Sequence, residues 1–153
     1  MTTRLNKLCF YAFVCGLLLL DQASKAFFVA NGDIEISRFF DFTLSYNEGS
    51  AFSLAIPSSI SGSLGLLVAL LLLLMPLIKK CDSYFSDKRL LAMMALLTAG
   101  VLGNTIDRLR IGKVIDFFHF SFWPIFNLAD SFLVVALIGL LISEFLLKSK
   151  NKL

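Results

Sequence analysis

Charged residues are scarce in this chain of 153 residues. Asp, Glu, Lys and Arg together make up 16% of the sequence, whereas hydrophobic residues make up 58%. Mean hydropathy is +0.82, a value that excludes a water-soluble globular domain. The net charge of +3 is small and gives no support for nucleic-acid binding. We therefore expect a single integral-membrane domain over residues 1–153, without a separate soluble catalytic module.

Histidine and cysteine are also few, which narrows the possible chemistry. His119 is the only histidine, and no His-Glu-x-x-His signature exists. Cys9, Cys15 and Cys81 form no Cys-x-x-Cys pair, so we interpret them as packing residues rather than as a disulfide or zinc site. The sequence therefore predicts no metal and no cofactor.

Serine hydrolase chemistry lacks its usual residues as well. No Gly-x-Ser-x-Gly motif is present, and a catalytic triad would have to be built on His119. Ser24 precedes Lys25, but neighbouring residues of a helix point about 100° apart and do not face each other. The carboxylates are the remaining candidates for hydrolytic chemistry.

Four apolar segments are each close to the ~20 residues that cross a bilayer, and they lie at about 8–30, 60–78, 90–106 and 128–147. The first is too long for a cleaved signal peptide and has the wrong C-terminal flank. The third contains small residues that let helices approach closely, namely Ala92, Ala95, Ala99, Gly100 and Gly103. We predict an all-α membrane protein with four transmembrane helices.

Basic residues predict the orientation of these helices. Nine of the fourteen fall before the first segment, between the second and third, or after the fourth: Arg4, Lys7, Lys79, Lys80, Lys88, Arg89, Lys148, Lys150 and Lys152. Because basic residues favour the cytoplasmic side, we expect both termini there and residues 31–59 and 107–127 on the outer side.

The first outer stretch alternates between apolar and polar residues. Apolar residues occupy the even positions Ile34, Ile36, Phe40, Phe42, Leu44 and Tyr46. A period of two predicts a strand, which Arg38 and Phe39 interrupt as a bulge or bend. We expect a small extracytoplasmic β platform that rests on the helix ends and could hold a substrate.

Several charges lie within a few residues of the predicted outer helix ends. A carboxylate within a span raises the free energy of membrane insertion by about 2.5 to 3.5 kcal/mol. These charges are Asp21, Lys25, Asp107, Arg108, Asp116 and Asp130. Asp21 and Lys25 are four residues apart, so we interpret them as an ion pair that stabilises the fold. The remaining acids need another explanation.

Asp130 stands at the head of the fourth segment, where it could cap the helix. Asn127 precedes it by three residues, so the two would share one helix face, and Asn104 and Asp107 repeat this spacing. Asp116 lies in an apolar stretch with no neighbour to neutralise it. Two carboxylates in a poorly solvated place share a proton, as in aspartic proteases, and at least one pKa then rises enough to give the pH profile an acidic limb.

Two other classes of function are compatible with these charges. In a small transporter or channel component, Asp21, Asp116 and Asp130 would relay protons or cations, although they gather at one membrane face and no polar chain continues to the other. In a non-catalytic assembly or chaperone subunit, the strand platform would hold a partner. Asp130→Asn distinguishes a binding protein from an aspartyl protease, because it preserves the shape of the side chain and removes only its proton transfer. A binding protein should largely keep its activity, and a protease should lose it.

Five short motifs occur in order along nearly the whole chain. They are Asp21-Gln22-Ala23-Ser24-Lys25, Asn47-Glu48-Gly49-Ser50-Ala51-Phe52-Ser53, Gly103-Asn104-Thr105-Ile106-Asp107-Arg108, Gly112-Lys113-Val114-Ile115-Asp116-Phe117 and Phe126-Asn127-Leu128-Ala129-Asp130-Ser131. Each is weak alone, but together they resemble the bacterial lipoprotein signal peptidase family, also called prolipoprotein signal peptidase or signal peptidase II.

The resemblance implies an aspartyl endopeptidase of the bacterial inner membrane, active near the outer leaflet. It would remove the signal peptide from diacylglyceryl-modified prolipoproteins by cutting before the lipidated cysteine. It implies Asp116 and Asp130 as the catalytic dyad and Asp21 and Lys25 as stabilising residues. The supporting or substrate-contacting positions would be Asn47, Gly49, Asn104, Asp107, Arg108 and Asn127. The implied partners are prolipoprotein substrates, membrane lipids and cyclic peptide inhibitors such as globomycin.

Overall fold

The computed structural model describes residues 2–49 and 57–150, with the side chains of residues 4–49 and 57–145. The four long helices are α1 (Thr2–Asn31), α2 (Ser58–Leu74), α4 (Lys88–Ile111) and α5 (Leu128–Lys150). Between α2 and α4 lie the short turns η2 (Met75–Leu77), η3 (Lys79–Cys81) and α3 (Asp82–Ser86). The strands are β1 (Phe40–Asn47), β2 (Val114–Phe120) and β3 (Trp123–Phe126).

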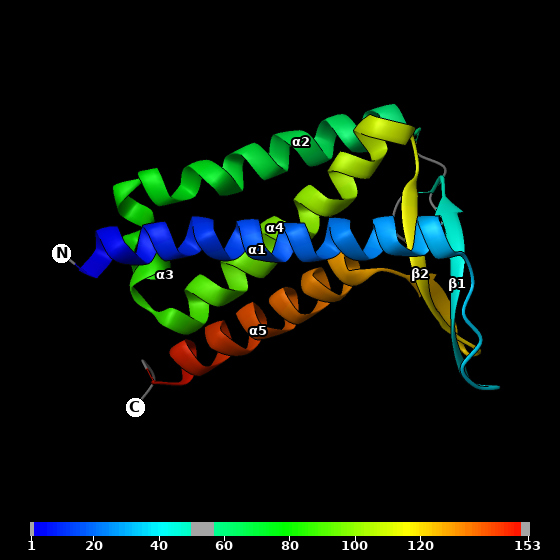
Figure 1. The fold of residues 1–153 in the computed structure, drawn as a ribbon. Coiled ribbons are helices and arrows are strands. Elements are labelled where there is room, and N and C mark those ends of the chain that lie inside the picture. Colours follow the sequence, from blue (N-terminus) through cyan, green and yellow to red (C-terminus); the bar gives the residue numbers. More distant parts are fainter. Residues whose placement is uncertain (1, 50–56, 151–153) are drawn as a thin grey trace.

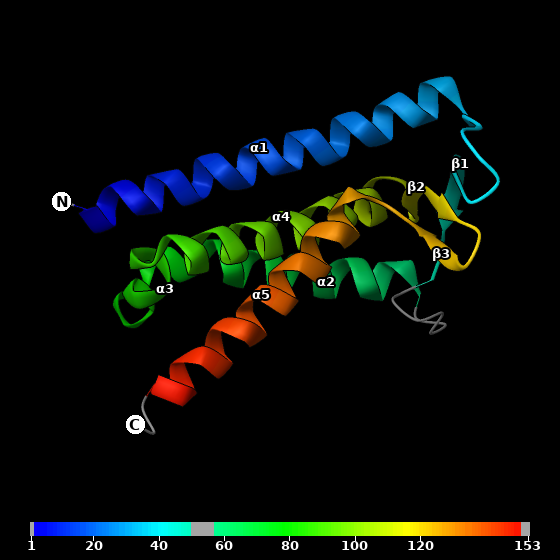
Figure 2. The same ribbon diagram turned by 90° about the horizontal axis from the view of Figure 1, so that it is seen from below.

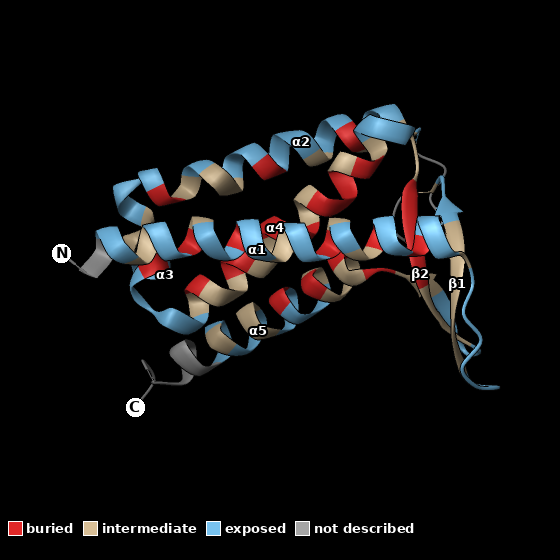
Figure 3. Cartoon of the chain, in the orientation of Figure 1, coloured by how far each residue is buried: buried red, intermediate tan, exposed pale blue. Residues whose placement is uncertain are grey.

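Helix α4 is the centre of the bundle. Helices α1, α2 and α5 each pack along it, and the three-stranded sheet stands at one end (Figures 1 and 2). Both chain ends lie at the opposite end of the bundle (Figure 1). Burial follows this arrangement, because α4 contains more buried residues than any other helix and β2 begins with four buried residues, whereas the outward faces of the other helices are exposed (Figure 3).

Four helices of the described residues are long and apolar enough to cross a membrane: Arg4–Asn31, Ser58–Leu77, Lys88–Ile111 and Leu128–Phe145. Their exposed faces carry large apolar side chains, such as Leu19, Leu71 and Leu141. Such faces are stable in contact with lipid chains rather than with water. The prediction of a four-helix membrane fold with a small sheet is confirmed.

The bounds of the helices differ from the predicted segments. Helix α2 starts at Ser58 and ends at Leu74, short of the predicted Ile78, because the chain tightens into a 3-10 turn at Pro76, which has no N–H to continue an α-helix. Helix α4 starts and ends outside 90–106. Asp87 caps its start by accepting from two backbone N–H groups, and Gly112, at φ 75°, ends it. The predicted outer connection from residue 107 therefore begins only after Ile111.

The first outer stretch forms a shorter strand than its alternation predicted. Only Phe40–Asn47 belongs to β1, and Ile34 instead folds back to pair with Phe42 through two backbone hydrogen bonds. The interruption predicted at Arg38 and Phe39 is the bend between these two arms. Alternation alone did not distinguish one long strand from two short arms of a hairpin.

Strands β2 and β3 were not predicted, since their dense aromatic residues obscure any period of two. The sheet is antiparallel in the order β1-β2-β3, and Ser45 lies opposite Asp116 while Asn47 lies opposite Val114. Phe28 at the end of α1 stacks on Phe42 and Phe117, with ring centroids 4.7 and 4.4 Å away. These contacts fix the sheet against the helix ends.

Candidate active site

Asp116 lies in the central strand β2 and is 2% exposed. Asn47, at the end of β1, donates its side-chain amide to Asp116 Oδ2 at 3.1 Å. Asn127 donates to the other oxygen, Oδ1, at 2.7 Å. Asn47 itself is exposed, whereas Asp116 and Asn127 are buried. The two predicted residues, 69 positions apart in sequence, meet because β1 and β2 pair.

Asp130 lies in the first turn of α5 and is half-buried. Asn104 of α4 donates its amide to Asp130 Oδ1 at 2.7 Å. Asn127 caps this helix, because its Oδ1 accepts from the Asp130 N–H at 2.9 Å while the Asn127 N–H faces Asp130 Oδ2 at 3.3 Å. Asn127 therefore precedes the helix. The prediction that Asn127 and Asp130 lie on one face of the same helix is wrong, because Asn127 is the capping residue.

Asn127 joins the two aspartates. Its side chain is fully buried, and its Nδ2 lies within hydrogen-bonding distance of Asp116, Asn104 Oδ1 at 3.1 Å and the Ile115 carbonyl at 3.2 Å. An amide has two hydrogens for these three acceptors. The short distance to Asp116 makes that contact the strongest of the three. The structure thus brings together both predicted dyad residues through one side chain.

Lys25 forms a buried ion cluster next to the dyad. Its Nζ lies 2.9 Å from Asp21, 2.8 Å from Asp107 and 3.3 Å from Asn104 Oδ1, which satisfies all three ammonium donors. Lys25, Asp21 and Asp107 are each no more than 1% exposed. The predicted pair of Asp21 and Lys25 is present, and Asp107 extends it.

The cluster also holds the backbone beside each dyad aspartate. Asp107 Oδ2 accepts from the N–H of Ile115, which precedes Asp116, at 3.2 Å. Asp21 Oδ1 accepts from the N–H of Ala129, which precedes Asp130, at 3.0 Å. Charge-assisted hydrogen bonds of this kind are stronger than neutral ones. One ion cluster therefore fixes the positions of β2 and α5 together.

Gln22 belongs to the same cluster, although no role was predicted for it from the sequence. Its Nε2 lies 3.1 Å from Asp21, 3.3 Å from Asp107 and 3.4 Å from the Gly103 carbonyl. Its position between Asp21 and Lys25 in the first motif is the signal that could have identified it.

Arg108 lies at the edge of the site and is half-buried. Its guanidinium donates to the carbonyl of Gly49 at 3.3 Å and to that of Asn104 at 3.4 Å. Gly49 in turn donates its N–H to Asn47 Oδ1 at 2.9 Å. Arg108 and Gly49 are therefore joined to Asn47. The rest of this motif, Ser50–Ser53, lies outside the described residues.

The environment of Asp116 favours its protonated form. Burial is the largest cause that raises the pKa of Asp116 to about 7, and the charge of Asp130 acts in the same direction. Hydrogen bonds from Asn47 and Asn127 oppose the shift without cancelling it. A carboxyl group that exchanges its proton near neutral pH is suited to acid–base chemistry.

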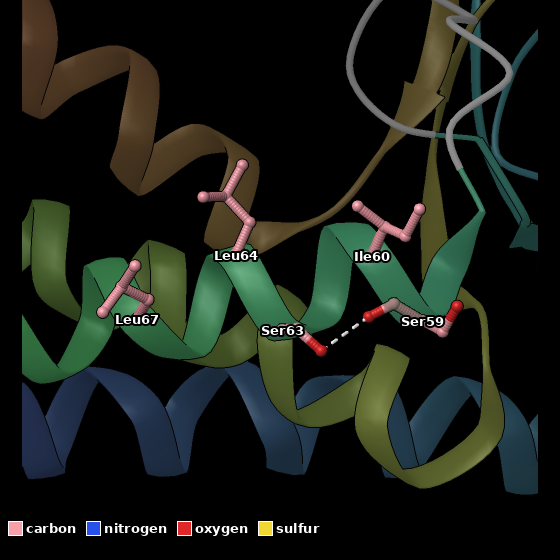
Figure 4. Close-up of a pocket in the computed structure, with 5 residues that line it drawn as sticks. All are labelled: Ser59, Ile60, Ser63, Leu64 and Leu67. Carbon is pink, nitrogen blue, oxygen red and sulfur yellow. Dashed lines mark hydrogen bonds between the residues drawn. The ribbon is translucent and has the colours of Figure 1, made fainter.

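Other candidate features in the described part of the chain contain no such pair of carboxylates. A groove of about 480 Å³ runs along α2, but its polar lining consists of Ser59 and Ser63, and Ser63 donates to the Ser59 carbonyl at 2.8 Å (Figure 4). His119 faces Asp41 at 2.8 Å. Among residues 2–49 and 57–150, no group of three His, Cys, Asp or Glu side chains could hold a metal ion.

A family model described as signal peptidase (SPase) II matches residues 13–146. The chain belongs to the signal peptidase II family. The resemblance drawn from the five motifs is therefore confirmed, and the chain is a multi-pass bacterial membrane protein with the character of a protease.

Curated relatives in this signal peptidase II family match most of the chain. It is 37% identical over 145 residues to the lipoprotein signal peptidase of Dehalococcoides mccartyi, covering 87% of this chain and 86% of that protein. It is 34% identical over 152 residues to the lipoprotein signal peptidase of Pseudomonas aeruginosa, covering 89% and 87%.

Solved structures share the fold. A bacterial membrane enzyme determined by the in meso method at 2.3 Å resolution aligns with a TM-score of 0.76 at 24% identity, covering 95% of this chain and 92% of that one. A second, at 1.9 Å, aligns with a TM-score of 0.72 at 23% identity, covering 88% and 91%.

Proposed function

We propose that this chain is an aspartyl endopeptidase that removes the signal peptide from prolipoproteins, with Asp116 and Asp130 as its catalytic dyad. The observation that carries the proposal is that Asn127 contacts both carboxylates, although they belong to different elements: its side-chain amide donates to Asp116 and its backbone N–H donates to Asp130. The names of the curated relatives support a lipoprotein substrate. We further propose that the scissile bond precedes a diacylglyceryl-modified cysteine.

The proposed reaction needs one protonated and one ionised carboxyl group. One carboxylate takes a proton from water as the water oxygen bonds to the peptide carbonyl carbon, and the other donates a proton to the carbonyl oxygen. The tetrahedral intermediate then collapses and the C–N bond breaks. The leaving amine takes up the proton that the base removed from water, and the donor regains its proton from the former carbonyl oxygen. We assign the initial donor to Asp116, whose raised pKa of about 7 leaves a large share of it protonated at neutral pH, and the base to the half-buried Asp130.

The neighbouring polar groups are suited to an extended peptide. Asn47 and Asn104 offer both donors and acceptors, and Arg108 already binds a backbone carbonyl, that of Gly49. A substrate backbone, or a cyclic peptide inhibitor such as globomycin, would compete for the same groups. We propose these residues as substrate contacts.

The position of the site in the fold agrees with such a substrate. The dyad lies where the helices meet the sheet, and both termini lie at the other end of the bundle (Figure 1). With the basic residues directed to the cytoplasm, the dyad would face the outer leaflet of the bacterial inner membrane. A translocated signal peptide reaches its cleavage region at that depth.

Purified protein in detergent tests the proposal with a lipid-modified precursor and the same precursor unmodified. We expect cleavage of the modified precursor only, and a loss of at least about a hundredfold in Asp116→Asn and Asp130→Asn. Asp41→Asn is the matched control, because Asp41 lies in the same sheet and pairs with His119 instead of the dyad. Full cleavage by either dyad variant would refute the catalytic assignment, and equal cleavage of both precursors would refute the lipid requirement.

A further inference from the structure

A second groove lies at the sheet end of the bundle, apart from the dyad. It has a volume of about 380 Å³ and is lined by Val29, Tyr46, Arg110, Ile111, Lys113 and Ile115. Tyr46 and Ile115 are directly opposite each other on β1 and β2. Because successive side chains of a strand alternate between faces, Ile115 faces away from its neighbour Asp116. The groove is therefore on the opposite face of the sheet from the dyad.

Two cations meet at this groove because Gly112 turns the chain between them. Arg110 lies in the last turn of α4, and Lys113 follows Gly112, whose φ of 75° suits glycine. Lys113 pairs with Glu48 at 2.7 Å. Arg110 is exposed and has no ion-pair or hydrogen-bond partner among the side chains that the structure describes. The groove thus has an excess of positive charge.

Its remaining walls are apolar and lie at the edge of the membrane. Val29 is 45% exposed, near the end of α1, and Ile111 is 40% exposed at the end of α4. Both α1 and α4 are membrane-spanning helices, so their sheet-side ends lie near the depth of lipid headgroups. Cations above apolar side chains at that depth match a phosphate above acyl chains.

We propose that this groove binds an anionic phospholipid, with Arg110 and Lys113 on the headgroup phosphate and Val29 and Ile111 against the acyl chains. The Tyr46 hydroxyl at the rim would donate a further hydrogen bond to the phosphate. Lys113 would exchange Glu48 for the lipid, and Glu48 lies between the site residues Asn47 and Gly49. This binding is independent of peptide cleavage.

Native mass spectrometry of the purified full chain, titrated with phosphatidylglycerol, tests this proposal. At about 1 kcal/mol per basic residue near a membrane surface, we expect about fivefold weaker binding for Arg110→Gln and about twenty-five-fold for Arg110→Gln/Lys113→Gln. Arg38→Gln removes the same charge from an exposed position in the bend before β1 and should change binding less than twofold. The side chains are at the surface, so the variants should keep the parent's circular dichroism spectrum.

Glu48→Gln tests the proposal through an expected gain in lipid affinity. It releases Lys113 and should tighten phosphatidylglycerol binding by up to about fivefold. Glu35→Gln, which removes the same charge from another exposed position, should leave binding unchanged. Unchanged binding in the double variant, or equal losses in Arg38→Gln and Arg110→Gln, would overturn the proposal. Equal binding of phosphatidylcholine, or competition by soluble glycerol phosphate, would overturn the choice of an anionic lipid.

Discussion

Asp21 accepts a hydrogen bond of 3.0 Å from the backbone N–H of Ala129, 108 positions later in the chain. This contact ties the first membrane helix to the residue before Asp130, and the partner of Asp21 in the ion cluster is Lys25. The position of Asp130 therefore depends on the charges of Asp21 and Lys25, which are not part of the proposed dyad.

Lys25→Met tests that dependence. It leaves Asp21 and Asp107 buried without their cation, which we expect to lower the free energy of unfolding by about 3 to 5 kcal/mol. Lys7→Met is the matched control, since Lys7 pairs with Asp82 at a partly exposed position and should lose less than about 1 kcal/mol. Unfolding in detergent, followed by circular dichroism, measures both, and equal small losses would contradict a buried cluster that stabilises the fold.

Substitution of Asn127 should separate capping from catalysis. Asn127→Ala removes both the cap and the donor to Asp116, so we expect a loss of about 1 kcal/mol in stability and about a hundredfold in cleavage. Asn127→Ser keeps a good capping hydroxyl that is too short for Asp116, and it should recover stability without recovering cleavage.

Ser131→Ala is the control for these variants. The Ser131 hydroxyl donates to the Asn127 carbonyl at 3.1 Å, so its removal changes the same helix turn and leaves the hydrogen bonds to both carboxylates in place. We expect less than a twofold change in cleavage. Full cleavage by Asn127→Ala would show that its link between the aspartates is dispensable.

The raised pKa of Asp116 makes stability depend on pH. Between the unfolded value of 3.8 and the folded value of about 7, the folded chain holds a proton that the unfolded chain has released. Stability contributed by this proton is fully present below pH 4 and is lost as the pH rises through about 7, by up to about 4 kcal/mol. Asp116→Asn should remove this dependence and be more stable than the parent at pH 8, as thermal melts at both pH values would reveal.

The rate of cleavage should also depend on whether Asp116 is protonated. If Asp116 donates it, the rate falls as the pH rises above about 7, and the second carboxyl group gives the acidic limb. A rate that is constant from pH 4 to 9 would contradict a shared proton.

Close packing of α4 against α5 gives a further prediction. A Cβ at Gly100 would lie 2.7 Å from the Ala129 carbonyl, which cannot move without shifting Asp130. We expect Gly100→Ala to lower stability by about 1 to 3 kcal/mol and also to reduce cleavage. Gly16→Ala meets nothing within 4 Å in α1 and should instead stabilise that helix by about 0.5 to 1 kcal/mol. Both variants add one methyl group to a helix, but only the methyl group at position 100 meets a neighbouring helix. Equal effects on stability would argue against close packing of α4 on α5.

Much of this protein follows from local pattern. Long apolar runs require helices in a bilayer, because helical hydrogen bonds satisfy the backbone where water is absent. The four predicted spans are present as helices, with different bounds. Pairs separated by one helical turn are equally local, so the contact of Asp21 with Lys25 could be predicted from spacing.

Strand pairing was beyond such local reasoning. Strands β2 and β3 were missed because apolar residues stand side by side in them, as at Phe117 and Phe118, and hide the period of two. The interruption at Arg38 and Phe39 was predicted, but not that the chain turns back there so that Ile34 pairs with Phe42. Strands are defined by distant partners, and no sequence window contains both sides of the pairing.

The sequence by itself determined the membrane class, the number of spans and the acids available for chemistry, since each depends on residue type and near neighbours. Only the tertiary structure decided that Asn127 joins Asp116 to Asp130, that Asp107 completes the cluster of Lys25, and that Arg110 and Lys113 share a groove. These contacts depend on how α4 packs and where β2 pairs. Burial and charge partners, which set the chemistry of a carboxyl group, arise from that packing and are not written in any one segment.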